Sequence, residues 1–389
     1  MTPREPSPFG PGNPSDPSAR YVFLRFLRYG FLAWGGPVAQ IGLMHRELVE
    51  RDGWITEDRF RKTLALYQAL PGPEAHELAV YFGMVKRGRL GGFLAGLGFM
   101  LPGVVLVTLL AAAYLSIAGV SDHVHRLLYG VRPAVAALVG FAVYRLARRT
   151  VDSALLAAIA VGAILASLLA PAVGLVGIMA AGGLAALAAT AVRSARSFAF
   201  APLGLASLAF PALGASGLLA LAVLSAKVGL LTFGGAYTAI PFLQAGAVEE
   251  HGWITQAQFL DALAITSLVP GPLVAVGTFV GYLAAGPAGA LLATVLIFAP
   301  AFAFTLVGHA FFERIVHAPR LHAFLMGVTA AVIGLIAVSI VPIARAGLVD
   351  IPTVAIALGA ALALARHVPI PAVVAGAAAA GLLVRLAAG

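Results

Sequence analysis

The chain carries one fifty-residue segment twice, at a constant spacing of 199 residues. Residues 26–75 align without a gap to residues 225–274, and about a third of the aligned positions are identical. The recurring motifs are Gly35-Gly36 with Gly234-Gly235, Gly53-Trp54-Ile55-Thr56 with Gly252-Trp253-Ile254-Thr255, and Pro71-Gly72-Pro73 with Pro270-Gly271-Pro272. Duplicated apolar segments interrupted by glycine and proline are typical of secondary transporters built from two related halves.

The composition requires a lipid bilayer as solvent. Of the 389 residues, 61% are hydrophobic and only 11% are charged, whereas a soluble domain is about half apolar and a quarter charged. About 10 to 13 stretches reach the length that spans a membrane as a helix. We therefore expect an all-α polytopic membrane protein made of two homologous helical repeats.

The pattern divides the chain into four parts. Residues 1–20 are rich in proline, serine and glycine and lack an apolar run, which predicts a disordered cytoplasmic tail. Residues 21–196 form the N-terminal repeat and residues 217–389 the C-terminal repeat. Residues 197–216 are a linker or an extra span. The sequence leaves the oligomeric state open, a homodimer included.

Charge and cysteine usage exclude several function classes. The formal net charge is +9, but no basic stretch is interleaved with aromatic residues, so a nucleic-acid partner is not expected. The chain contains no cysteine, which excludes thiolate metal sites and thiol redox chemistry. We expect no cofactor and no metal, since a single His123-x-His125 pair is a weak metal signal.

The basic loops favour antiparallel halves. Loop 86–89 reads Lys-Arg-Gly-Arg, while its counterpart, 285–287, is uncharged and loop 314–320 carries two arginines. Since basic loops stay in the cytoplasm, an inverted repeat explains this distribution better than a parallel one.

The glycine and proline motifs predict broken or re-entrant helices around an internal cavity. Proline removes a backbone donor, and irregular backbone survives at membrane depth only where protein or water satisfies it. Half-helices that begin after such breaks present free N–H groups to an anion. The alternative is that the small residues only allow close helix packing. The motif residues form the expected substrate site: Gly35, Gly36, Pro37, Pro71, Gly72, Pro73, Gly234, Gly235, Pro270, Gly271 and Pro272.

Two cations occupy equivalent positions, Arg28 and Lys227. A charge inside a span usually faces a cavity or a partner, although a long side chain can also reach the membrane interface. Paired cations of this kind suit an oxyanion. We add Gln40, Tyr237 and Thr238 as neutral donors.

One ionisable cluster lies in the first copy alone. Glu74, His76 and Glu77 follow the first Pro-Gly-Pro, and their counterparts are apolar. Such groups form proton relays or gates, while an acidic residue at a helix N-terminus is also favoured by the dipole. The cluster is the one candidate for catalysis in a membrane-embedded enzyme, the alternative from another class; with no nucleotide or hydrolase motif elsewhere, we expect no enzyme.

Three segments of the first half resemble the chromate transporter family, in its long two-domain form. They are residues 31–41 (Phe-Leu-Ala-Trp-Gly-Gly-Pro-Val-Ala-Gln-Ile), the Gly-Trp-Ile-Thr segment, and residues 68–73 (Gln-Ala-Leu-Pro-Gly-Pro). Residues 231–242 and 266–272 are similar to the second domain of that family. The resemblance implies chromate export across a bacterial inner membrane and chromate resistance, with sulfate as a related substrate. One departure is Ala236, which stands where the first copy has Pro37.

Overall fold

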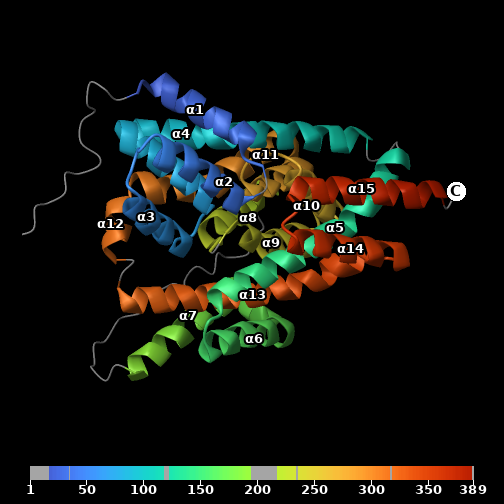
Figure 1. The fold of residues 1–389 in the computed structure, drawn as a ribbon. Helices are drawn as coiled ribbons and strands as arrows, with labels where there is room; N and C mark the ends of the chain where they lie inside the picture. Colours follow the sequence, from blue (N-terminus) through green and yellow to red (C-terminus); the bar gives the residue numbers. More distant parts are fainter. Residues whose placement is uncertain are drawn as a thin grey trace, which may run out of the picture.

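The computed structural model describes residues 17–34, 36–117, 122–193, 217–233, 235–315 and 318–387, and their regular elements are helices (Figure 1). The predicted all-α fold is confirmed. The α-helices are α1 (Ala19–Leu32), α2 (Pro37–Met44), α3 (Glu57–Ala69), α4 (Glu74–Ile117), α5 (Asp122–Thr150), α6 (Ala154–Leu169), α7 (Gly174–Arg193), α8 (Gly217–Leu231), α9 (Ala239–Leu243), α10 (Gln256–Ser267), α11 (Val276–Leu306), α12 (His309–Ile315), α13 (Pro319–Gly347), α14 (Ile351–Ala365) and α15 (Ile370–Ala387).

Six of the described helical stretches are long and apolar enough to cross a membrane: 74–116, 128–150, 171–190, 273–306, 319–347 and 370–387. Their number and length fit a multi-pass membrane protein. The predicted linker, 197–216, and residues 1–16 of the predicted tail lie outside the described residues. Residues 19 and 20, which we assigned to the tail, are the first two of α1.

Both copies of the repeat fold in the same local way. Each has a π-helix at the same place, η1 (His45–Arg51) and η5 (Gln244–Glu250). After the Gly-Trp-Ile segment, Thr56 caps α3 and Thr255 caps α10, and the second cap forms a capping box with Gln258.

Helices end and restart at the glycine and proline motifs. In the first copy the breaks separate α1 from α2 and α3 from α4. In the second copy they separate α8 from the 3-10 helix η4 (Ala236–Thr238), and α10 from the 3-10 helix η6 (Leu273–Ala275). We call residues 33–36 and 232–235 the glycine tips, and residues 70–73 and 269–272 the proline tips.

The chain reverses direction at these tips. The Trp54 ring lies after the first glycine tip, yet its centroid is 6.3 Å from that of Phe26, which precedes the tip. The same ring is 6.4 Å from Phe82, beyond the proline tip. In the second copy, Leu224 of α8 packs against Gly246 of η5 across the glycine tip. The tips therefore close helical hairpins.

The long helices α4 and α11 fold back a second time at matching glycines. Gly88 and Gly286 have φ of +59° and +64°, and each sits at a sharp kink. Beside each kink two glycines meet, Gly83 against Gly91 and Gly281 against Gly289, which brings the two arms into close contact. The spacing between the copies is 198 here (286 − 88), one residue less than in the motifs.

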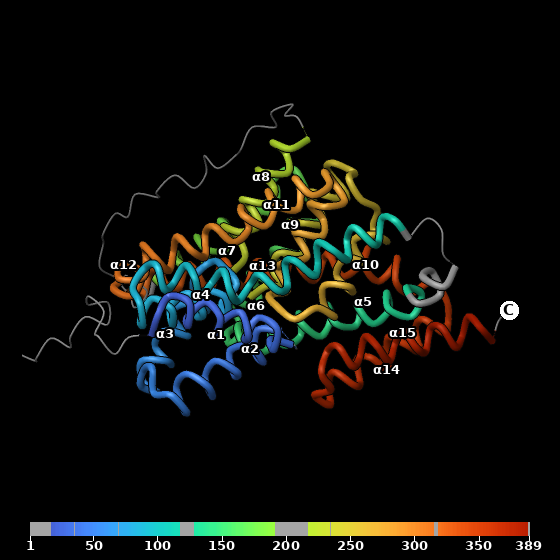
Figure 2. The backbone as a smooth tube through the Cα atoms, turned by 90° about the horizontal axis from the view of Figure 1, so that it is seen from above, coloured from blue at the N-terminus to red at the C-terminus, as the bar shows by residue number. Residues whose placement is uncertain are grey.

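The remaining helices pack crosswise between the halves. Helix α5 of the first half packs on α14 and α15 of the second, and α13 of the second half packs on α6 and α7 of the first (Figures 1 and 2). Equivalent glycine pairs make both contacts, Gly130 with Gly381 and Gly327 with Gly182. Each half thus completes its apolar packing only against the other half.

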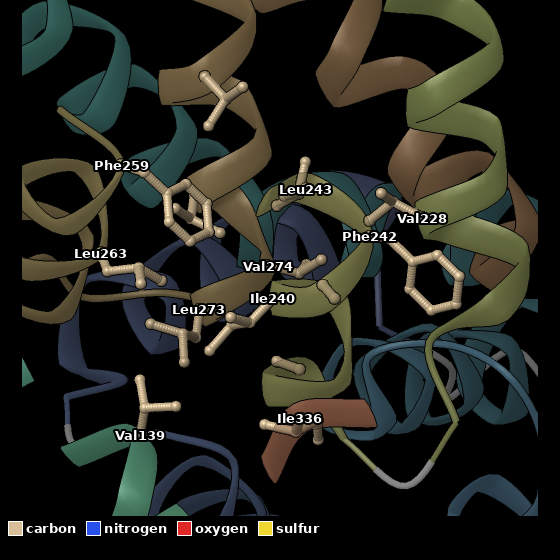
Figure 3. Close-up of a cluster of buried hydrophobic side chains, with 14 of the residues drawn as sticks. Val139, Val228, Ile240, Phe242, Leu243, Phe259, Leu263, Leu273, Val274 and Ile336 are labelled. Carbon is tan, nitrogen blue, oxygen red and sulfur yellow. The ribbon is translucent and has the colours of Figure 1, made fainter. Parts of the chain in front are cut away.

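The second-copy hairpins are set in the largest apolar cluster. Figure 3 shows Ile240 and Leu243 of α9 beside Val274 of η6, with Phe259 of α10 and Val228 of α8 around them. These side chains are buried. Dense packing on both sides of the breaks fixes the position of the tips.

Candidate substrate site at the junction of the two copies

The tips of the two copies meet through a pair of equivalent hydrogen bonds. The backbone N–H of Gly72 donates to the carbonyl oxygen of Thr232 at 2.8 Å, and the N–H of Gly271 donates to that of Ala33 at 3.1 Å. Gly271 lies 199 residues after Gly72, and Thr232 lies 199 residues after Ala33, so the two bonds join equivalent positions. Each proline tip therefore joins the glycine tip of the other copy, and the four tips form one junction.

Gln40 of α2 reinforces this junction from one side. It is buried, and its side-chain amide donates to the carbonyl oxygen of Ala33 at 3.2 Å and to that of Gly271 at 2.7 Å. Its amide hydrogens thus hold the glycine tip of its own copy and the proline tip of the other together. Its side-chain oxygen is buried and has no hydrogen-bond partner among the described residues.

Helix N-termini begin at the junction. Helix α2 starts from Gly36 (φ +82°) at Pro37, and η4 starts from Gly235 (φ +118°). Helix η6 starts from Pro272, and α4 starts directly after Pro73. No side chain caps α2, η4 or η6, so their first backbone N–H groups remain to be satisfied. Gly35 and Gly234 of the predicted site lie outside the described residues.

Glycines also allow the proline tips to approach their neighbours closely. A Cβ atom at Gly103 of α4 would lie 2.7 Å from the carbonyl oxygen of Pro270, so the second proline tip rests on α4 backbone. At the first proline tip, Pro71 pairs with Phe233 in an isolated backbone bridge.

The two predicted neutral donors of the second copy lie just beyond its glycine tip. Thr238 is buried, and its hydroxyl donates to the carbonyl oxygen of Gly235 at 2.7 Å. Tyr237 is half-buried and packs against the apolar clusters. The Thr238 hydroxyl therefore stabilises the turn in the described state.

The two predicted cations differ in environment. Arg28 is on the exposed face of α1, whereas Lys227 of α8 is half-buried. Each lies five residues before the carbonyl group that accepts a cross-copy bond, Ala33 or Thr232. In helical geometry this is roughly 7–8 Å along the axis. Both are therefore about one and a half helical turns from the junction.

The ionisable cluster of the first copy is buried at the start of α4. Glu77 and His76 have no exposed surface, and Glu74 is 8% exposed. The His76 ring lies 5.0 Å from that of Phe298 and 4.8 Å from that of Phe302, both on α11. The Glu77 carboxyl group lies directly under the first proline tip, because a Cβ atom at Gly72 would be 2.9 Å from its Cδ.

An ion pair that the sequence did not single out joins the hairpins to the crosswise helices. Asp261 of α10 is fully buried and accepts from Arg132 of α5 through both carboxylate oxygens, at 2.8 and 2.9 Å. The Tyr114 hydroxyl, near the end of α4, donates to the same carboxylate at 2.9 Å. We name Arg132, Asp261 and Tyr114 the α10 cluster.

A second cluster occupies the corresponding place on α3. Arg59 forms an ion pair with Glu313 of α12 and donates to the Tyr81 hydroxyl at 2.9 Å. The Tyr67 hydroxyl lies 3.0 Å from Nδ1 of His309. The α10 cluster ties α10 to the distal end of α4, and the second cluster ties α3 to α12, the helix that follows α11. Asp261 and Arg132 are single charges in apolar stretches of the sequence, but 129 positions separate them.

Comparisons with known proteins agree with this duplicated architecture. The family model described as chromate transporter matches the chain twice, over residues 20–200 and 219–382. A chromate transport protein of Pseudomonas aeruginosa is 42% identical over 354 residues, which cover 87% of this chain and 84% of the relative. One from Cupriavidus metallidurans is 37% identical, over 94% of this chain and 92% of the relative. A probable chromate transport protein of Synechococcus elongatus is 34% identical, over 92% and 93%. No solved structure matches the chain.

Proposed function

This chain belongs to the chromate transporter family, and from that premise we propose that it exports chromate across a bacterial inner membrane by alternating access. The main support for this proposal is the junction, where the N–H groups of Gly72 and Gly271 each donate a hydrogen bond to the glycine tip of the other copy. A site made of equivalent elements from two halves is the arrangement in which one half can move against the other around a fixed ligand.

The anion binds between the four tips. The uncapped N-termini of α2, η4 and η6 offer backbone N–H groups and the positive ends of helix dipoles. Lys227 and Arg28 supply positive charge on the approach to the tips. An oxyanion can accept many hydrogen bonds at once, so a ring of backbone donors suits it without a metal or cofactor.

The two halves lie antiparallel in the membrane, and the closed junction opens alternately to either side. The basic loop at 86–89 and its uncharged counterpart support this orientation. The α10 cluster and the Arg59–Glu313 pair hold the hairpins of opposite copies. Each of these two ion pairs breaks when the site opens toward the side of the membrane on which that pair lies.

The membrane potential supplies enough energy. Moving one elementary charge through 100 mV is worth about 2.3 kcal/mol, so a dianion that leaves a cell with a negative interior gains about 4.6 kcal/mol. At about 1.4 kcal/mol per tenfold change, this sustains a concentration ratio on the order of a thousandfold. Glu74, His76 and Glu77 add a proton-linked or gating role.

The test is uptake of radiolabelled chromate into inverted membrane vesicles, with and without an imposed potential and with excess sulfate. We expect potential-dependent chromate uptake that sulfate inhibits weakly. Uptake of sulfate without chromate would replace this proposal by a general oxyanion carrier. Chemical turnover of a substrate without net flux would indicate a membrane-embedded enzyme. Light scattering of the purified protein would decide whether the working unit is a homodimer.

A further inference from the structure

Within the first-copy cluster, the side chain of Glu77 lies against Gly72 of the first proline tip. Its carboxyl group has no exposed surface, and neither of its oxygens has a hydrogen-bond partner among the described residues. It lies against Gly72, the residue whose N–H reaches across to Thr232. An ionised carboxylate in such a place would be an uncompensated buried charge, which is costly.

Among the residues that the structure describes, no cation acts on Glu77. The titratable groups in electrostatic range are Glu74 on the same helix and the Tyr67 phenol on α3. Arg149 of α5 acts on Glu74, and Arg59 acts on Tyr67. From α11 the nearby surface is formed by Phe298 and Phe302, which flank His76. An arriving dianion would add further negative charge at the same tip.

We propose that the tips close over the anion only when Glu77 carries a proton, so that a proton gates transport. This deepens the proposed function and rests on it. In the open state the carboxylate meets water and exchanges its proton freely. On closure a neutral O–H group moves under Gly72, and repulsion between the carboxylate and the dianion is absent. The second copy has an apolar side chain at this place, so one proton controls both halves.

The inference predicts a specific pH profile. With one required proton, chromate flux through the wild-type protein falls about tenfold per pH unit once the pH exceeds the value at which Glu77 ionises in the open state. Glu77→Gln has nearly the shape of the neutral acid and cannot ionise. It should keep transporting at high pH, with a profile that is flat where the wild type declines. Glu77→Asp keeps a titratable group, so its chromate flux should again decline as the pH rises.

The experiment uses purified full-length protein in liposomes, with radiolabelled chromate at a fixed potential from pH 6 to 9. The matched control is Glu250→Gln, which removes an exposed carboxylate and should retain the wild-type profile. Because protonation of chromate itself would affect all proteins equally, a decline that persists in Glu77→Gln overturns the inference. Absence of chromate flux in the wild type at every pH would instead overturn the proposed function. If Glu77→Gln fails to fold, Glu77→Asp takes its place in the test. A decline of chromate flux at the same pH as in the wild type would then equally contradict a gate at this residue.

Discussion

Gly72 and Thr232 are 160 residues apart in the chain, yet the N–H of the first donates to the carbonyl oxygen of the second at 2.8 Å. The equivalent bond from Gly271 to Ala33 makes the contact reciprocal. A single backbone hydrogen bond contributes only about 0.5–1.5 kcal/mol net. The junction is therefore well defined in the structure, although each of its two bonds alone is weak.

Substituting the glycine under the first proline tip should block transport. At Gly72 (φ +148°) an alanine Cβ would meet the Glu77 carboxyl group, whereas at Gly53 (φ +58°) it would meet nothing within 4 Å. Both changes strain the backbone, by on the order of 1–3 kcal/mol. We expect Gly72→Ala to reduce chromate uptake into inverted vesicles at least tenfold per inserted molecule, and Gly53→Ala to retain most of it. Equal uptake in the two variants would contradict a role for the tip.

Neutralising the half-buried cation of α8 should abolish transport in a protein that still inserts. A charge along an entry path raises the rate of anion binding by about 10- to 1000-fold, so Lys227→Gln should lower flux at sub-saturating chromate at least tenfold. Arg61→Gln removes a surface cation that pairs with Glu57 and serves as the control. Wild-type flux from Lys227→Gln, at matched protein levels, would remove this residue from the site.

The α10 cluster should behave as a buried ion pair in a double-mutant cycle. Asp261→Leu alone leaves the Arg132 guanidinium without its partner, and the cost should be about 3–5 kcal/mol. The double variant with Arg132→Leu should recover a large part of that loss. The exposed Lys62–Asp58 pair is the comparison, for which we expect about 0–1 kcal/mol. Thermal unfolding of detergent-purified protein measures the wild type and, for each pair, the two single variants and the double variant, and simple additivity at Arg132 and Asp261 would argue against coupling.

A carboxylate in the turn before α14 should make the protein sensitive to acid. The Tyr129 hydroxyl donates to Asp350 at 2.6 Å and holds the pKa of this carboxyl group below its ordinary value, assisted by Thr353. A depressed pKa stabilises the fold above the unfolded-state value of about 3.9. This contribution is lost as the pH falls through the lower, folded-state pKa. Tyr129→Phe should lower the melting temperature at neutral pH and narrow the difference from wild type near pH 3; a constant difference would contradict the assignment.

Helix breaks follow from local chemistry and could be predicted, and the helix caps are equally local. Thr56 and Thr255 precede helices as N-caps because their side chains satisfy free N–H groups wherever the helix lies. The breaks at Pro71 and Pro270 follow from a missing backbone donor. Gln40 stays a predicted neutral donor, but its partners in the structure could not be predicted: its amide hydrogens bind the carbonyl groups of Ala33 and Gly271.

The sequence by itself determined the duplication, the helical membrane class and the places where the chain must bend, because periodicity, hydropathy and glycine or proline geometry act within a few residues. Only the tertiary structure decided that each proline tip meets the glycine tip of the other copy, and that Asp261 pairs with Arg132. Those contacts join positions more than 120 residues apart. They depend on how whole helices pack, which no local pattern specifies.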